Sequence, residues 1–247
     1  MADAPARTVL AVTGADREGF LQDLVTNDVR RLEGGPVYAA LLTAQGKYLA
    51  DFVMVPAGEA IWLDVATPLA EGLARRLAMY RLRRKVEVAP ADVGVTTGRG
   101  AAPGGAVTDP RDPALGWRLY GSASGPDLPD GLRVERMVPA AGAELIPDES
   151  YPLEMGFERL QGVDFRKGCY VGQEVTARMK HKTELRKGLA RVRVEGDAAP
   201  GTPVERDGRA VGTLRTRAGD RALAYLRLDR AGDGMSAGGA AVTLDAA

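Results

Sequence analysis

The pattern of apolar and polar residues changes after residue 188, and this change strongly constrains the fold. From there to residue 244, short runs of alternating apolar and polar residues are separated by glycines at intervals of roughly ten residues. Alternation with a period of two is typical of strands, and several short strands joined by turns form a sandwich or a barrel. The sequence therefore predicts a separate all-β domain at its carboxyl-terminal end.

The first 89 residues carry the patterns of strands and helices. Runs rich in β-branched and aromatic residues predict strands at 7–13, 37–43, 48–55, 60–65 and 85–89. Residues 15–25 and 67–82 place apolar side chains at helical spacing, and Thr67-Pro68 supplies an N-cap and a first-turn proline. The three strands, helix and strand over residues 37–89 predict an antiparallel sheet with a helix on one face, a compact α+β unit.

Residues 94–178 give weaker signals. Short strands are expected near 93–97 and 116–120, and a short helix over 131–141. A helix-like turn at 153–157 and a helix over 172–178 follow.

The residues able to do chemistry concentrate in the stretch 162–174, which holds the only cysteine, flanking glycines, two cations and a Gln-Glu pair. Glycines there allow positive φ or a close approach to a ligand. Arg166 and Lys167 next to Cys169 would favour the thiolate, which is the reactive form. A lone cysteine also packs well as a small buried hydrophobe. The local sequence therefore leaves both a reactive thiol and a structural residue open.

The composition excludes several kinds of site and partner. With one cysteine the chain cannot form an internal disulfide, and a metal or iron–sulfur site usually needs three or four ligands, a shortage that the sole His181 does not cover. The 33 basic and 33 acidic residues give zero net charge, so no overall field draws the chain to nucleic acid or membranes. A free thiol, no signal-peptide pattern and no apolar run of about 20 residues predict a cytoplasmic protein without a membrane span.

The octapeptide Lys167-Gly168-Cys169-Tyr170-Val171-Gly172-Gln173-Glu174 resembles the signature of the YgfZ family, Lys-Gly-Cys-aromatic-x-Gly-Gln-Glu, and all seven specified positions match. Residues 9–28 resemble the amino-terminal strand and helix of that family. Thr43-Ala44-Gln45-Gly46-Lys47 resembles its hairpin turn. The resemblance therefore covers the whole chain.

The resemblance implies an α+β, three-domain GcvT-like arrangement around a central folate-type cavity, as in the related glycine-cleavage aminomethyltransferase. The expected domains are a split first domain at 1–34 and 122–183, a ferredoxin-like second domain at 35–121, and a carboxyl-terminal β-barrel at 184–247. It also implies a bound tetrahydrofolate or related folate. The expected partners are iron–sulfur enzymes or assembly factors, including [4Fe–4S] enzymes that modify tRNA.

Site residues carry over only at matching positions. These are Lys167, Gly168, Cys169, Tyr170, Gly172, Gln173 and Glu174, with Cys169 tied to the activity. Glu154 resembles the acidic residue that binds the pterin, since a carboxylate accepts two N–H donors. With Lys167 and Gln173 it forms the expected folate-binding set. One departure concerns the catalytic aspartate of the aminomethyltransferases, which has no counterpart in or after Asp64-Val65-Ala66-Thr67-Pro68.

Three roles for the Cys169 thiol remain open: a single ligand of a shared cluster, a redox-active nucleophile, or a structural residue of a tight loop. Two function classes follow, an accessory factor for iron–sulfur enzymes and, alternatively, a folate-dependent aminomethyltransferase-type enzyme. The basic run Arg178-Met179-Lys180-His181-Lys182 would either meet an anion or link two domains. Because it lacks interleaved aromatic residues, direct nucleic-acid binding is not expected.

Overall fold

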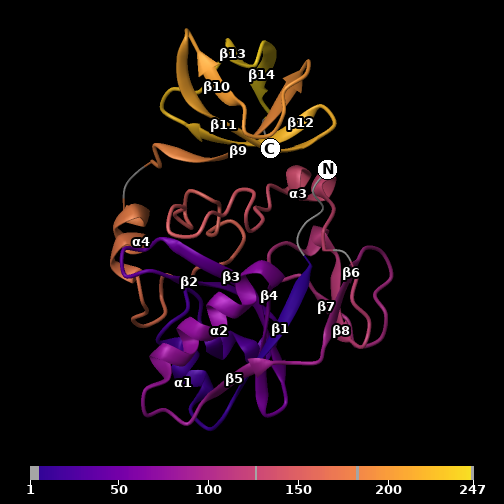
Figure 1. Ribbon diagram of the computed structural model, residues 1–247, viewed down its shortest axis with the longest axis vertical. Helices are drawn as coiled ribbons and strands as arrows, with labels where there is room; N and C mark the ends of the chain where they lie inside the picture. The colour runs from indigo at the N-terminus through magenta and orange to yellow at the C-terminus, as the bar shows by residue number, and fades with distance from the viewer. Residues whose placement is uncertain (1–5, 126, 182–183, 246–247) are drawn as a thin grey trace.

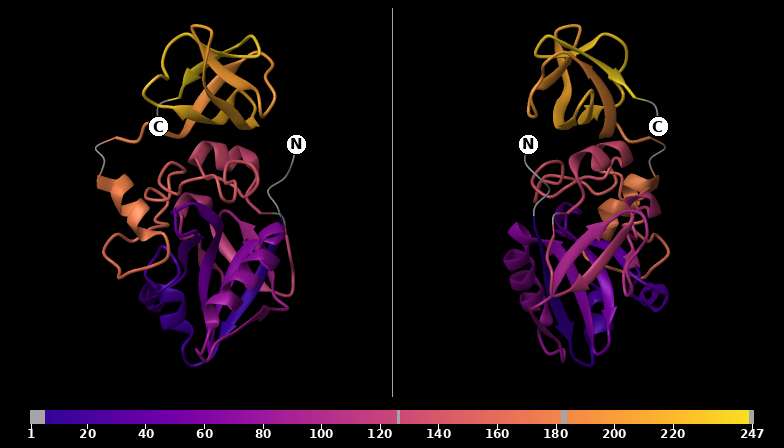
Figure 2. Two further views of the ribbon diagram at one scale, coloured as in Figure 1. Left: turned by 60° about the vertical axis from the view of Figure 1, so that its left-hand side comes forward. Right: turned by 90° about the vertical axis from the view of Figure 1, so that its right-hand side faces the viewer.

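A computed structural model describes residues 6–125, 127–181 and 184–245. Two sheets lie at one end of the molecule and a barrel lies at the other, with an irregular segment between them (Figure 1). Seen from two further sides, the barrel is stacked on that segment and on helix α3 (Asp130–Arg136), while α4 (Gln173–His181) lies against the flank (Figure 2). No helix in the described ranges is long and apolar enough to cross a membrane.

The main sheet has five strands in the order β2-β3-β4-β1-β5, and each neighbouring pair is antiparallel. Its strands are β1 (Arg7–Thr13), β2 (Val37–Leu42), β3 (Tyr48–Ala57), β4 (Ala60–Ala66) and β5 (Glu87–Pro90). The helical elements beside it are α1 (Arg17–Gln22), the 3₁₀ helix η1 (Val29–Gly34) and α2 (Thr67–Arg81). The expected strands, hairpin and helices are therefore confirmed.

Both faces of the main sheet are covered, which explains why β2 reads as one continuous apolar run. On one face, Phe20, Leu73 and Leu77 from α1 and α2 join a cluster with alternate strand residues. On the other face, Leu128 and Phe157 from the irregular segment join a second cluster. A strand buried on both sides loses the alternation of a half-exposed one. The sequence pattern predicted a helix on one face and did not reveal the irregular cover on the other.

The sheet differs from the expected division into domains. Strand β1 pairs with β4 along all its residues from Arg7 to Thr13, and its other edge pairs with β5. The expected boundary between residues 34 and 35 therefore separates β1 from the sheet in which it lies. A strand pattern gives no information on which distant strand will be its neighbour, and this pairing spans more than 50 residues.

A small second sheet joins the main one through buried charges. It contains β6 (Gly94–Gly98), β7 (Val107–Thr108) and β8 (Trp117–Gly121), with the 3₁₀ helix η2 (Pro113–Leu115) before β8. Arg118 on β8 is fully buried and contacts Asp64 at 2.9 Å, Asp109 at 3.1 Å and Asp127 at 3.1 Å. Because a buried charge is costly unless it is paired, this cluster fixes the two sheets against each other.

The carboxyl-terminal strands close into a six-stranded barrel, which confirms the predicted all-β domain. Its strands are β9 (Lys187–Glu195), β10 (Pro203–Arg206), β11 (Arg209–Ala218), β12 (Arg221–Arg227), β13 (Met235–Ala237) and β14 (Ala240–Leu244). The barrel has its own apolar cluster. The short β13 lies in a glycine-rich tract and was not predicted. Thr216 of the barrel accepts a hydrogen bond from Arg133 of α3 at 3.0 Å, which joins the barrel to the rest.

Candidate functional site

The loop between Gly162 and α4 presents the cysteine to solvent. Cys169 is a free, exposed thiol. A Cβ on the neighbouring Gly168 would meet no atom within 4 Å, so the backbone beside the thiol is open to an approaching molecule. This exposure argues against the reading of Cys169 as a small buried hydrophobe.

Lys167 anchors this loop to the segment between residues 22 and 27. Its side chain is only 4% exposed, and its ammonium donates hydrogen bonds to the carbonyl oxygens of Gln22 at 2.7 Å, Asn27 at 3.1 Å and Val25. Burial lowers the pKa of Lys167 to about 8. The three N–H donors of the ammonium are thus committed to backbone acceptors. The geometry gives Lys167 an anchoring role in this loop.

Two buried polar residues hold the other side of the loop. Thr26 donates through Oγ1 to the Gly162 carbonyl at 2.6 Å and accepts the backbone N–H of Asp164 on its own carbonyl at 3.0 Å. Asn27 donates through Nδ2 to the carbonyl of Gln161 at 2.6 Å. The sequence indicated only a helix break at these positions. Their role emerges from contacts with residues more than 130 positions away.

Two glycines let the cysteine loop pack against the hairpin turn between β2 and β3. Gly172 has φ +82°, and a Cβ there would lie 2.4 Å from the Thr43 carbonyl oxygen. Gly46 in the turn has φ +73°, and its Cβ would lie 2.8 Å from the Val175 Cβ. Both glycines therefore meet requirements that a side chain would violate. Two of the three segments that carried the sequence resemblance, the octapeptide and the hairpin turn, are direct neighbours in space.

The remaining motif residues support the loop or lie at the surface. Tyr170 is buried in the second apolar cluster, and its ring lies 5.0 Å from the Lys167 ammonium. Gln173 accepts the Tyr170 backbone N–H on Oε1 at 3.3 Å. Glu174 is exposed and pairs with Arg178 at 2.6 Å. Most of the octapeptide therefore builds a frame from which Cys169 projects.

No group of three or more His, Cys, Asp or Glu residues that could hold a metal ion occurs within the described part of the chain. Cys169 therefore belongs to no such group among the described residues. Lys182, in the basic run, and the expected domain boundary at residue 183 fall outside the described residues.

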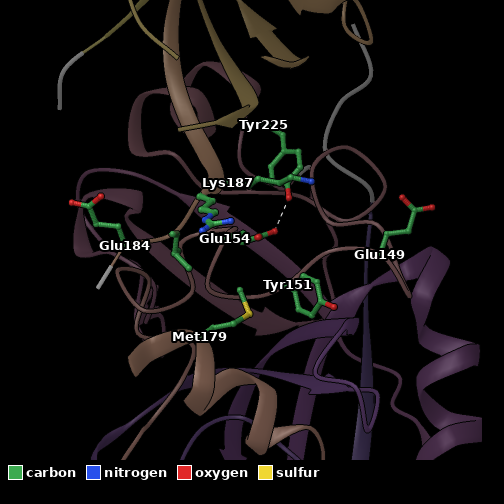
Figure 3. A pocket seen from close by; sticks show the side chains of 9 residues that line it. Glu149, Tyr151, Glu154, Met179, Glu184, Lys187 and Tyr225 are labelled. Atoms are coloured by element: carbon green, nitrogen blue, oxygen red, sulfur yellow. Dashed lines mark hydrogen bonds between the residues drawn. The ribbon is translucent and has the colours of Figure 1, made fainter. Parts of the chain in front are cut away.

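A second candidate site is a cavity of about 810 Å³ below the barrel. Figure 3 shows Tyr225 and Lys187 of the barrel above Glu154, with Met179 of α4 on the opposite side. The lining also includes Glu149, Tyr151, Glu184, Leu185 and Arg186. This volume lies in the range of about 300–1,000 Å³ typical of small-molecule sites.

Glu154 is held in the cavity by the barrel. The Tyr225 hydroxyl donates to its Oε2 at 2.6 Å (Figure 3), and the Leu189 backbone N–H donates to its carbonyl at 2.7 Å. Burial, with the Glu154 carboxylate as the next cause, raises the pKa of Tyr225, so the phenol remains a donor. The second carboxylate oxygen, Oε1, has no hydrogen-bond donor among the described residues.

The structure separates residues that the sequence grouped together. Of the three residues in the expected folate-binding set, Glu154 lines the cavity, whereas Lys167 and Gln173 do not. Cys169 is also absent from the described lining. Helix α4 lies between the two places, with the cysteine before its first turn and Met179 in its last. Sequence reasoning missed Tyr225, which lies 71 positions from its partner Glu154.

The chain is similar to several characterised proteins. The CAF17 C-terminal beta-barrel domain matches residues 186–247. The mitochondrial iron-sulfur cluster assembly factor IBA57 of Homo sapiens is 31% identical over 267 residues, covering 89% of this chain and 75% of that protein. The Mus musculus factor of the same name is 31% identical over 271 residues, covering 90% and 75%.

The fold has a solved counterpart. The crystal structure of glycine cleavage system aminomethyltransferase T from Bartonella henselae matches with a TM-score of 0.75 and 14% identity, covering 99% of this chain and 86% of that one. At this identity the likeness establishes the fold. The chain has a GcvT-like aminomethyltransferase fold with a carboxyl-terminal β-barrel.

Proposed function

Since the chain belongs to the CAF17/IBA57 family of iron–sulfur cluster assembly factors, we propose that it assists the assembly, maturation or repair of [4Fe–4S] enzymes and that Cys169 is its working thiol. The octapeptide resemblance named the related YgfZ family, whereas the sequence relatives are IBA57 proteins and the barrel matches CAF17. Enzymes that modify tRNA are among the proposed clients. Because the net charge is zero, the proposal involves client enzymes and no direct binding to RNA.

The observation that carries this proposal is the exposed Cys169 thiol on a loop that is fixed by three sets of contacts. These are made by Lys167, by Thr26 with Asn27, and by Gly172. A thiolate is the usual protein ligand of an iron–sulfur cluster, and such clusters usually take four. A chain with one cysteine supplies one ligand at most. The proposed cluster is therefore shared, and a partner, a second copy or a small thiol provides the other ligands. A redox role of the same thiol is the alternative within this proposal.

Replacement of the thiol in cells tests the proposal. In a strain that lacks the native gene, we expect Cys169→Ala to fold normally and to fail to restore [4Fe–4S] enzyme activity. Gly168→Ala is the matched control on the same loop, because a Cβ there meets nothing within 4 Å. Full enzyme activity with Cys169→Ala would rule the proposal out.

Folate binding is the second part of the proposal and concerns the cavity. The free Oε1 of Glu154 is able to accept an N–H donor of an aminopyrimidine ring, and Tyr225 orients the carboxylate. A ligand that binds only the native state raises the melting temperature. We expect tetrahydrofolate to raise the melting temperature of the wild type and to have no effect on Glu154→Gln. Equal shifts in the two proteins, or no shift in either, would rule out this site.

The alternative, aminomethyltransferase-type catalysis, finds less support in the geometry. Asp64, at the end of the relevant strand, is fully buried and bound by Arg118 at 2.9 Å and by Arg7 at 2.7 Å. A carboxylate committed to two guanidinium groups is a structural element. The alternative is tested by mixing the chain with a lipoyl carrier protein and tetrahydrofolate. Observed methylene transfer to tetrahydrofolate would support it.

Localisation also remains a proposal. The relatives named above are mitochondrial by their names. For this chain we propose the reducing cytoplasm, because a free exposed thiol persists there. Fractionation of cells that express the native gene, with immunodetection of the chain, tests this location.

A further inference from the structure

The end of α2 exposes a patch of large apolar side chains. Met79 is 66% exposed, Tyr80 38% and Leu82 87%. Three of the six exposed large apolar residues of the described chain therefore lie within four consecutive positions. Leu82 has φ +48°, a left-handed conformation that is uncommon outside glycine. Single exposed apolar residues are ordinary, whereas a cluster marks an interaction surface.

The same segment is strongly basic. Its cations are Arg75, Arg76, Arg81, Arg83, Arg84 and Lys85. Two of them are paired, Arg75 with Glu71 and Arg84 with Asp23. Within the described residues, Arg76, Arg81 and Arg83 form no ion pair. Cations near a helix end favour the helix dipole, but a single turn does not account for this excess in a chain whose net charge is zero.

An apolar groove adjoins the patch on the same helix. It has a volume of about 170 Å³, and its lining includes Leu41, Leu49 and Leu69, with Arg76 and Asp148 as its charged residues. Gly72 also lines it and is exposed, and a Cβ there would meet nothing within 4 Å. A cavity of about 150 Å³ admits a benzene-sized group. The groove therefore has room for one apolar side chain of a partner.

The groove and the patch form one continuous stripe. Gly72, Arg76, Met79 and Tyr80 follow the spacing of four, seven and eight residues that places side chains on one helix face. At a rise of about 1.5 Å per residue the stripe is roughly 12 Å long. Leu73 and Leu77 of α2 are buried in the first apolar cluster, and α2 covers one face of the main sheet (Figure 1).

We propose that this stripe of α2 docks an acidic, amphipathic segment of a partner protein. One apolar side chain of that segment enters the groove beside Gly72, and its carboxylates pair with Arg76 on the stripe and with Arg83 beyond the helix end. Tyrosine, methionine and arginine are the residue types enriched in protein interfaces. Charge complementarity selects an acidic segment over a basic or neutral one.

Other charged partners fit the stripe less well. A helix that lies in a membrane interface presents its whole apolar face to the lipid, whereas α2 buries that face in the core. A nucleic-acid surface stacks bases on several aromatic rings, and Tyr80 is the single aromatic residue of the stripe. The surface does not include Cys169 or the cavity, so the proposal stands independently of their roles.

Peptide selection on the full chain tests the proposal. A display library of random 14-residue peptides is enriched on the wild type, and recovered peptides are measured by fluorescence anisotropy. We expect a consensus of acidic residues with apolar residues at helical spacing. Gly72→Gln and the double variant Arg76→Glu, Arg83→Glu should each weaken binding at least tenfold.

The variants are chosen so that misfolding does not mimic lost binding. Glutamine is a better helix former than glycine, so Gly72→Gln should melt no lower than the wild type while it fills the groove. Arg75→Glu serves as the charge control, and Cys169→Ala should retain full peptide binding. No enrichment, a basic consensus, or binding that is unaffected by the variants would overturn the proposal. So would stronger variant-sensitive binding to phosphatidylserine vesicles or to single-stranded RNA.

Discussion

The cysteine loop and the cavity below the barrel are built by different means. The loop rests on backbone groups: Lys167 reaches three carbonyls, Thr26 and Asn27 reach two more, and Gly172 packs on the hairpin turn. The cavity depends on side chains from separate domains, above all Tyr225 and Glu154. The loop is therefore held in a fixed position, from which one thiol is exposed. The cavity lies at the contact between the barrel and the segment that carries Glu154, here called the seam, and a ligand or a domain movement is able to alter it.

This difference predicts where substitutions act. Changes at the loop frame should lower the free energy of unfolding, since they leave buried backbone groups unpaired. Changes at the seam should alter ligand binding with a smaller effect on stability.

Lys167→Met should have the largest effect. It removes the cation that three carbonyl oxygens share, two of them in buried hydrogen bonds, and each unpaired acceptor is costly. We expect a loss of about 2–4 kcal/mol in the free energy of unfolding, measured by urea denaturation. Arg166→Met, at an exposed neighbour, is the control and should change stability by less than about 0.5 kcal/mol. Equal effects of the two changes would show that Lys167 is no anchor.

Gly172→Ala should be the next most damaging change. The residue has φ +82°, and the new methyl group would lie 2.4 Å from the Thr43 carbonyl oxygen. We expect a destabilisation of about 1–3 kcal/mol. Gly168→Ala, in open space four residues earlier, should be near neutral in the same thermal-melting series. A neutral Gly172→Ala would contradict the packing of the loop on the hairpin.

Tyr225→Phe tests the seam. Loss of the hydrogen bond to Glu154 should cost about 0.5–1.5 kcal/mol of stability. Its greater effect should be on tetrahydrofolate, whose stabilisation of the protein should fall because the Glu154 carboxylate loses its orientation. Tyr151→Phe, in the same cavity lining, is the matched control. If both variants respond to the ligand like the wild type, Tyr225 has no positioning role.

The loop frame should also show a pH dependence of stability. Burial lowers the folded pKa of Lys167 to about 8 from the ordinary 10.5. Between these values the unfolded chain binds more protons than the folded one, so stability rises with pH. The wild type should therefore gain stability relative to Lys167→Met from pH 8 to pH 10.5. Parallel stability curves for the two proteins would contradict the shift.

Sequence patterns predicted what is local. The octapeptide at 167–174, the β2–β3 hairpin and most of the barrel strands follow from spacing and turn residues within short windows. The insertion of β1 between β4 and β5 was not predictable, because strand periodicity does not specify a partner. The anchoring role of Lys167 was also hidden, since its acceptors are backbone carbonyls more than 130 residues away. A carbonyl has the same chemistry in every residue, so no side-chain pattern marks such an acceptor.

The central claim is that Cys169 supplies one ligand of a shared iron–sulfur cluster. The most direct measurement is anaerobic reconstitution of the purified chain with ferrous iron, sulfide and glutathione, read by protein-bound iron and visible absorption. The reconstitution is run with and without glutathione. The wild type should hold cluster iron only when glutathione supplies the missing thiols, and Cys169→Ala should hold none in either case. Equal iron in the wild type and in Cys169→Ala would contradict the claim.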